Sequence, residues 1–489
     1  MGPIKDQLGL EQGGPNSSEL YKIYNNEQLK VAQESGFGTS ISGIPVASVG
    51  QADDTALLSN NLFQLQCLLD LSLEYCKKHQ VQLSAGKTKL LVFSNLDTDY
   101  VQYSKLLSPL NIDGLPIEFA TVAEHVGVLR AVAGHLPHVH QRIVSHRRAL
   151  ASVLGMGMAR RHRANPIAAL KAELIFASPV LFSGMSSLIL TQAETSMLAL
   201  HVKETTERLL KLHSKTPEPV VFFLAGRLPG EALLHVKQLT LFGMICHLPG
   251  NILHTIAVQL LTCSKQNSKN WFSNIRTLCF TYNLPHPLIL LKDPPSKDAL
   301  KTLVKANVTD YWQIKLQSHS ATLKSLTYFK PQFMSLHRPH PMWRAAVTSY
   351  QVNKCVQVSR MLSGRFRCGA LLRHLHPHIS GLCELCGLEL EELPHFLIPR
   401  CPKLKHRVPS LLRFARETFA PSYIASTIFE EIIQNEDDQK KVQFLLDPST
   451  IPEIIAAEQN SPGILEIFLT VTTTWCYAMN RARLKLLGK

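Results

Sequence analysis

The sequence predicts an α+β protein, with short strands near the start of the chain and mostly helices after them. Three observations lead to this fold class. Residues 44–57 read as two strands joined by a tight turn. Residues 135–350 carry apolar side chains at helical spacing, interrupted by proline-containing joints. Residues 383–401 gather cysteine and histidine at a spacing typical of a small metal-bound module.

The first 95 residues predict the order helix, strand, turn, strand, helix, strand. Apolar residues recur every three or four positions in the helical segments, and β-permissive runs bounded by glycine mark the strands. These patterns predict helices at 20–36 and 61–80 and strands at 44–49, 55–59 and 89–93. Asn60 or Asn61 can cap the second helix, because a side-chain oxygen there accepts a free backbone N–H.

Asp53 and Asp54 occupy the turn between the first two predicted strands. Paired aspartates are common in turns because their side chains bond nearby backbone groups, so a plain hairpin turn is one interpretation. A divalent-cation site is the other, since hard cations such as Mg²⁺ take carboxylate oxygens as ligands. The local sequence leaves both interpretations open.

The bulk composition predicts an intracellular protein with a polyanionic partner. Lys and Arg number 51 against 37 Asp and Glu, a formal net charge of +14 over 489 residues, which favours RNA or DNA as a partner. The 11 cysteines form no secreted-style framework, and the N-terminus has no apolar core of a signal peptide. Composition does not distinguish nucleus from cytoplasm.

One uncharged stretch, residues 174–190, bears on membrane association. It contains Pro179, Gly184 and four serines and is short for a bilayer span. We interpret it as a buried helix pair or a kinked helix, and we expect no membrane partner.

Cys383, Cys386, His395 and Cys401 have the spacing C-x2-C-x8-H-x5-C. Thiolate and imidazole are the ligands that Zn²⁺ prefers, and four of them leave no open position, so the predicted zinc is structural. A chance cluster of buried residues is the alternative. Further possible ligands are Cys368, His374, His376 and His378.

Cations flank this predicted zinc module on both sides. Because lysine and arginine neutralise phosphates, these residues are candidate nucleic-acid contacts. They are Arg360, Arg365, Arg367, Arg373, Lys403, Lys405 and Arg407.

In chain order, three motifs together resemble the reverse transcriptase of non-LTR (LINE-type) retrotransposons. GLEQGGPNSSE (9–19) is similar to the stretch that lines the template and nucleotide pocket in that family, and Gln51–Asp54 to its aromatic-Ala-Asp-Asp box. GKTK (86–89) is similar to its lysine motif. The later similarities are looser and comprise Val126–Gly127–Val128, LFSG (181–184) and LAGRLPGEAL (224–233).

The resemblance implies an RNA-directed DNA polymerase that acts on RNA, DNA and deoxynucleoside triphosphates. Asp53 and Asp54 would hold Mg²⁺ for two-metal nucleotidyl transfer, and Lys87 would stabilise charge on the triphosphate. A zinc knuckle of the CCHC type near the C-terminus is similar to one that many such proteins carry. The residues implied for nucleotide and template binding are Gln12, Gly13, Pro15, Ser17 and Gln51.

The resemblance also implies how the chain is divided. A partial reverse-transcriptase palm is followed by a helical thumb and connector, a small zinc-knuckle module and a helical tail. The expected segments are a palm at 1–130, a thumb-like region at 131–215, a connector at 216–353, a basic CCHC zinc-knuckle region at 354–410 and a tail at 411–489.

Two departures from the family pattern lead us to expect impaired catalysis. Gln51 stands where the family has an aromatic residue, and the family's upstream strand with a further metal-binding aspartate has no counterpart before the 9–19 stretch. A truncated palm is therefore expected. The alternatives are a non-enzymatic zinc and nucleic-acid-binding remnant, and an unrelated helical scaffold, which the absence of a hairpin presenting Asp53 and Asp54 would favour.

Overall fold

The structure is a computed structural model of the whole chain. It describes residues 15–51, 53–93, 110–155, 165–265, 268–398 and 400–488. The chain forms two compact units and passes between them several times. The first unit comprises residues 1–142, 183–194 and 238–301, and the second comprises residues 143–182, 195–237 and 302–489.

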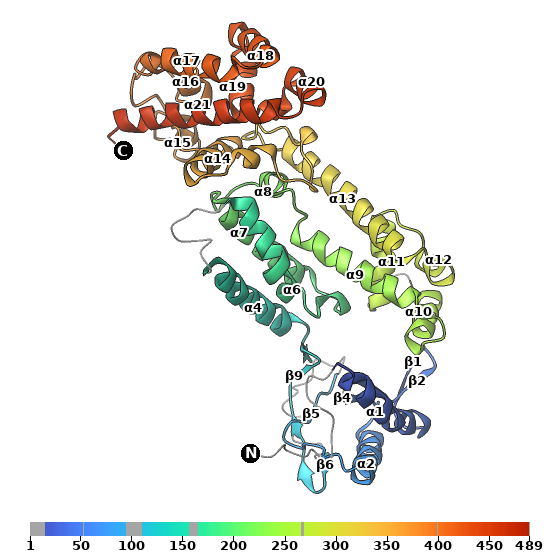
Figure 1. Cartoon of the computed structure of the whole chain (residues 1–489). Helices are drawn as coiled ribbons and strands as arrows, with labels where there is room; N and C mark the ends of the chain where they lie inside the picture. The colour runs from blue at the N-terminus through green and yellow to red at the C-terminus, as the bar shows by residue number, and fades with distance from the viewer. Residues whose placement is uncertain are drawn as a thin grey trace, which may run out of the picture. The chain divides into compact units, whose positions relative to one another are not determined.

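Two helices and a series of short strands make up the described residues before position 132 (Figure 1). The helices are α1 (Ser17–Glu34) and α2 (Leu62–Lys78). The strands are β1 (Thr39–Ile41), β2 (Ile44–Val46), β3 (Ser48–Gln51), β4 (Asp54–Leu57), β5 (Lys89–Leu90), β6 (Asn111–Ile112), β7 (Leu115–Pro116), β8 (Glu118–Phe119), β9 (Val122–His125) and β10 (Val128–Ala131).

These described strands pair two by two, and the β5–β8 pair is parallel while the other four pairs are antiparallel. The predicted order of helices and strands is confirmed, with three differences. An additional strand, β1, precedes the strand expected at 44–49. The strand expected at 44–49 is divided at Ala47, because β2 pairs with β1 and β3 pairs with β4. The strand expected at 89–93 is shortened to Lys89–Leu90.

Helix α2 organises the core of this part of the first unit. The Asn61 side chain accepts the N–H of Gln64 at 2.8 Å, so Asn61 and not Asn60 is the cap. Leu68 packs with Ala32 of α1 and with Ala47, while the adjacent Leu69 packs in a second cluster. Its buried neighbours there are Leu110, Ile112 and Ile117. A continuous apolar face on α2 thus holds helix and strands together.

Helices account for most of the remaining described residues. They are α4 (Leu136–Gly155), α5 (Pro166–Ala172), α6 (Ser178–Leu181), α7 (Gln192–Leu210), α8 (Glu218–Ala225), α9 (Gly230–Cys246), α10 (Ile252–Cys263), α11 (Trp271–Thr281), α12 (Pro287–Lys292), α13 (Lys297–Ala321), α14 (Ser349–Leu362), α15 (Gly369–Leu375), α16 (Leu393–Leu397), α17 (Val408–Phe419), α18 (Tyr423–Gln434), α19 (Asp438–Leu446), α20 (Pro452–Asn460) and α21 (Ile464–Leu486). This agrees with the predicted predominance of helix after the first strands.

The apolar stretch at 174–190 is a kinked helical segment, as predicted. A π-helical turn, Glu173–Ala177, leads into α6, and Gly184 then adopts a left-handed backbone conformation. The prediction of burial was wrong for Leu174, Ile175 and Phe176, which are 41%, 65% and 59% exposed. The wider π turn directs these three side chains outward while Glu173 and Ala177 stay buried.

Within the described residues, no single helix is long and apolar enough to cross a membrane. Helices α8 and α9 reach the required length and hydropathy only when taken together, and they are bent by 60° at the break between them.

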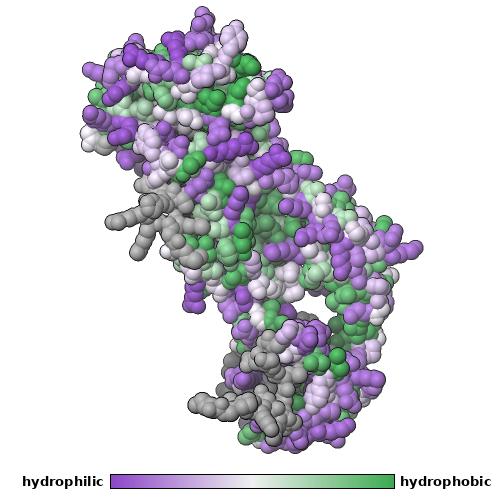
Figure 2. Space-filling view, viewed as in Figure 1, coloured by the Kyte–Doolittle hydropathy of each residue, from purple (hydrophilic) through white to green (hydrophobic). Residues whose placement is uncertain are grey.

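The C-terminal part of the second unit is built around α21. Figure 1 shows this helix lying between α14 on one side and α17 to α20 on the other. Its Phe468 packs into a cluster of fully buried phenylalanines with Phe419, Phe429 and Phe444. On the face drawn in Figure 2, helices α17, α18 and α20 present mostly hydrophilic residues. Helix α21 also contacts α16, the short helix that carries His395.

Candidate metal centre

A tight turn brings the first two cysteine ligands together. Leu382 and Leu390 form an antiparallel bridge, and the N–H of Gly387 donates to the carbonyl oxygen of Cys383 at 2.8 Å. Gly387 has a φ of +68°, a conformation that side chains disfavour, so glycine suits the position after Cys386. We call residues 381–404, which contain this turn and the later ligands, the Cys/His module.

The other two ligands come from a short helix and the loop after it. His395 lies on α16, and the N–H of Cys401 donates to the carbonyl oxygen of His395 at 3.0 Å. Both side chains are buried, as is Cys383, whereas Cys386 is partly exposed. The module therefore presents three inner ligands and one nearer the surface.

The spacing of the four ligand atoms fits zinc. Cys383 Sγ and Cys401 Sγ are 4.0 Å apart, and Cys386 Sγ lies 3.4 Å from His395 Nε2. All four ligand atoms lie within 4.8 Å of one another. Tetrahedral zinc with its usual bond lengths gives edges of about 3.8 Å between sulfurs and about 3.6 Å between sulfur and nitrogen. The cluster can therefore hold a metal ion such as zinc.

The electrostatic environment differs between the inner and outer thiols. Burial raises the pKa of Cys383 to about 12 and also raises that of Cys401. Burial opposes ionisation of Cys386 too, but backbone N–H donors at Leu388 and Glu389 favour its thiolate and its pKa is lowered to about 7. A bound divalent cation would stabilise all three thiolates, so metal binding would release protons.

The carboxylate of Glu389 accepts a hydrogen bond from the His395 ring nitrogen that faces away from Cys386. Glu389 Oε2 lies 3.0 Å from His395 Nδ1, while Nε2 of the same ring faces Cys386. The carbonyl oxygen of Glu389 also accepts the N–H of Cys383 at 2.8 Å. Glu389 therefore contacts ligands on both sides of the cluster.

A buried ion pair fixes the Cys/His module to the last helix. Arg483 of α21 donates through Nε and Nη2 to the two carboxylate oxygens of Glu391, at 2.6 and 2.7 Å. Glu391 also accepts the N–H of Gly369 at 2.8 Å. A Cβ at Gly369 would lie 2.3 Å from the carbonyl oxygen of Gly381, so only glycine fits there. Trp475 adds a bond from its indole N–H to the carbonyl oxygen of Leu397 at 3.0 Å.

Six of the seven predicted nucleic-acid contacts are exposed: Arg360 and a group of five, Arg367, Arg373, Lys403, Lys405 and Arg407. Within the part of the chain that the structure describes, none of these five forms an ion pair. The other two differ. Arg360 donates through Nε and Nη2 to the carbonyl oxygen of Lys211, at 3.1 and 2.9 Å, and Arg365 is only partly exposed.

The predicted carboxylate pair lies at the end of a β-hairpin. In the β3–β4 pair Gln51 is opposite Asp54, so Asp53 lies in the turn while Asp54, which was expected in the turn, begins β4. Asp53 and Asp54 are both exposed. Burial and then the charge of Asp53 raise the pKa of Tyr21, so the hairpin end lies near the beginning of α1. We call residues 48–57 the carboxylate hairpin.

No third acidic ligand from the described part of the chain joins Asp53 and Asp54 at this hairpin. Among the described residues, the one group of three or more potential metal ligands is the Cys/His cluster. Lys87 is exposed in a turn before β5, with its N–H bonded to the carbonyl oxygen of Ser84. Pro15 and Ser17 lie at the start of α1, and Gln12 and Gly13 lie outside the described residues.

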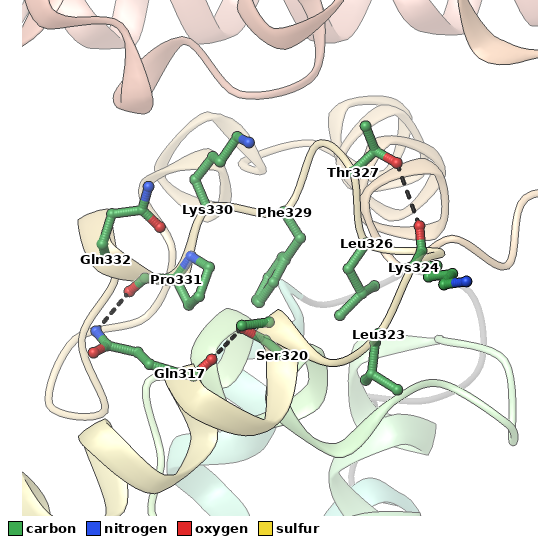
Figure 3. A pocket seen from close by; sticks show the side chains of 11 residues that line it. Gln317, Ser320, Leu323, Lys324, Leu326, Thr327, Phe329, Lys330, Pro331 and Gln332 are labelled. Carbon is green, nitrogen blue, oxygen red and sulfur yellow. Dashed lines mark hydrogen bonds between the residues drawn. The ribbon is translucent and has the colours of Figure 1, made fainter.

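A pocket of about 420 Å³ lies where α13 ends, as Figure 3 shows. Leu326 and Phe329 give it an apolar floor. Two of its polar side chains bond within the chain, because Ser320 donates to the carbonyl oxygen of Gln317 and Gln317 donates to that of Pro331. Lys324, Lys330 and Gln332 also line the pocket.

No protein-family model matches this chain, and no curated protein is recognisably similar to it.

The sequence predicted the four ligands but missed the residues that support them. Glu389 follows the second cysteine by three positions, and that proximity was the available signal. Arg483 is 92 residues from Glu391 and carries no local signature. Only the folded arrangement brings such residues together.

Proposed function

We propose that this chain is a zinc-containing nucleic-acid-binding protein related to the reverse transcriptases of LINE-type retrotransposons. The observation that carries the proposal is the Cys/His cluster, whose four ligand atoms lie within 4.8 Å of one another. Four protein ligands complete a tetrahedral site, so the zinc would order the chain and would not perform chemistry.

Charge supports the nucleic-acid part of the proposal. Arg367 and Arg373 precede the cluster, and Lys403, Lys405 and Arg407 follow it, all exposed. A zinc-ordered turn would hold these cations in fixed positions, and each phosphate that they neutralise releases counterions and strengthens binding at low salt. The chain's net charge of +14 acts in the same direction.

Metal content and RNA affinity of the purified chain test this proposal. We expect one zinc per chain and binding of a fluorescent oligoribonucleotide that weakens steeply with salt. Cys383→Ser should lose the zinc and weaken RNA binding. Cys263→Ser is the matched control, because Cys263 is an exposed thiol outside the cluster. A chain that takes up no zinc, or that binds RNA equally well after zinc removal, would contradict the proposal.

A second candidate function is RNA-directed DNA synthesis at the carboxylate hairpin. The hairpin favours it, because β-strand pairing gives Asp53 and Asp54 a defined position near the beginning of α1. Two Mg²⁺ ions there would activate the attacking 3′ oxygen and stabilise the leaving group, and Lys87 would lie toward the triphosphate. Deoxynucleoside triphosphates, RNA and DNA would be the substrates.

Primer extension on an RNA template with Mg²⁺ separates the two candidates. Extension that is abolished by Asp53→Asn and retained by Glu74→Gln, an exposed control on α2, would establish polymerase activity. Zinc and RNA binding without extension would leave the non-enzymatic function. We expect the second result, because the described residues give the hairpin no third acidic ligand.

A further inference from the structure

We infer that Glu389 is a positioning residue of the metal centre, which holds the His395 imidazole in the orientation and tautomer that zinc coordination requires. The inference rests on the proposed zinc site and adds a residue that the C-x2-C-x8-H-x5-C spacing does not contain.

A hydrogen bond between the His395 imidazole and Glu389 fixes the tautomer of the ring. Glu389 Oε2 lies 3.0 Å from His395 Nδ1, and a carboxylate can only accept there, so Nδ1 carries the proton. The lone pair is then on Nε2, which faces Cys386 Sγ at 3.4 Å. Histidines that bind metals commonly have such a carboxylate on the other nitrogen, where it fixes the ring and raises its basicity.

The backbone of Glu389 contacts a second ligand. Its carbonyl oxygen accepts the N–H of Cys383 at 2.8 Å. Glu389 therefore contacts two of the four ligands, His395 through its side chain and Cys383 through its main chain. Its side chain links α16, which carries His395, to the turn that carries the first two cysteines.

The Glu389 side chain is much more exposed than the ligand that it contacts. Glu389 is 55% exposed whereas the His395 side chain is 3% exposed. A half-exposed carboxylate contributes little to the stability of the metal-free fold. Removal of the Glu389 side chain should therefore lower the zinc affinity and leave the stability of the metal-free fold unchanged.

Zinc affinity of the full chain, measured by competition with a chromophoric chelator, tests the inference. We expect Glu389→Ala to weaken zinc binding by about 10–100-fold, the range for loss of such supporting contacts. Glu389→Gln keeps an acceptor oxygen without the charge, so it should fall between Glu389→Ala and the wild type. Glu392→Gln is the control, because it removes one exposed acid from the same module without touching a ligand.

Two further measurements separate a positioning role from a general structural role. Saturating Co²⁺ should give the same thiolate-to-cobalt absorption band in Glu389→Ala as in the wild type, because all four ligands remain. The unfolding temperature in excess EDTA should also be unchanged.

An unchanged zinc affinity in Glu389→Ala, or an equal loss in Glu392→Gln, would overturn the inference while leaving the zinc site intact. A lower unfolding temperature without metal would likewise replace positioning by a structural role. If the wild type itself takes up no zinc, the proposed function fails and this inference fails with it.

Discussion

The Cys/His module and the carboxylate hairpin were both predicted from short sequence motifs, but they differ in burial and in how many potential ligands lie together. The Cys/His module places all four ligand atoms within 4.8 Å, buries three of the ligands and surrounds them with supporting bonds. The carboxylate hairpin leaves Asp53 and Asp54 exposed at the end of a two-stranded pair. A site whose ligands lie within one short segment can assemble locally, whereas a polymerase site needs acids from strands far apart in the chain.

The largest expected effect is on the Cys/His module itself. Cys383→Ser removes a buried ligand, so we expect zinc affinity to fall by more than about 100-fold, beyond the loss caused by outer contacts alone. Metal analysis after dialysis against a chelator measures this. Retention of one zinc per chain would mean that Cys383 is not an essential ligand, and the proposed four-ligand site would be wrong.

The next effect concerns the attachment of the module to α21. Arg483→Met leaves the Glu391 carboxylate buried without its partner, which should cost about 3–5 kcal/mol in the free energy of unfolding. Urea unfolding measures the loss. The double variant Glu391→Gln with Arg483→Met should recover part of it, since no isolated charge remains. An effect below 1 kcal/mol in the single variant would indicate that the module is independent of the last helix.

A smaller effect is expected from acid, through a buried network elsewhere in the second unit. His201 Nε2 lies 3.0 Å from His146 Nδ1, and His146 in turn bonds Glu173, which pairs with Arg227. Burial, followed by the neighbouring His146, lowers the pKa of His201 from 6.5 to about 4. The unfolded chain therefore binds a proton between pH 6.5 and 4 that the folded chain does not.

His201 contributes its full stability above pH 6.5, and about 3 kcal/mol is lost as the pH falls to about 4. His201→Gln keeps a donor to His146 without titrating, so its unfolding free energy should depend less on pH. The difference between the two proteins removes the zinc contribution, which both share. Identical slopes would rule out His201 as a source of acid sensitivity.

The smallest effect is expected at the carboxylate hairpin. Asp53→Asn and Asp54→Asn change exposed side chains, so each should alter the unfolding free energy by no more than about 0.5 kcal/mol. Thermal unfolding with and without Mg²⁺ measures both the substitution and any bound cation. If Mg²⁺ raises the unfolding temperature of the wild type but not of the variants, the carboxylate hairpin binds a metal ion as the Cys/His module is proposed to do.

The sequence predicted local features well and long-range pairs poorly. Helix α2 and the zinc ligands follow from periodicity and spacing within 20 residues, and the structure has both. The outward turn of Leu174, Ile175 and Phe176 could not be predicted, because a π turn shifts which side chains face the core. The Glu391–Arg483 pair and the His146–Glu173–His201 network depend on packing between helices, for which one sequence carries no periodic signal.

The bond between Glu391 and Arg483 has a consequence for synthesis of the chain. The two residues are 92 positions apart, so a ribosome adding 5–20 residues per second would take roughly 5–20 s to supply the arginine after the glutamate. Through that interval the Glu391 carboxylate lacks Arg483, and the residues that pack against α21 lack that helix. A pause late in translation would lengthen this period, in which chaperones and proteases have access to the incomplete C-terminal layer.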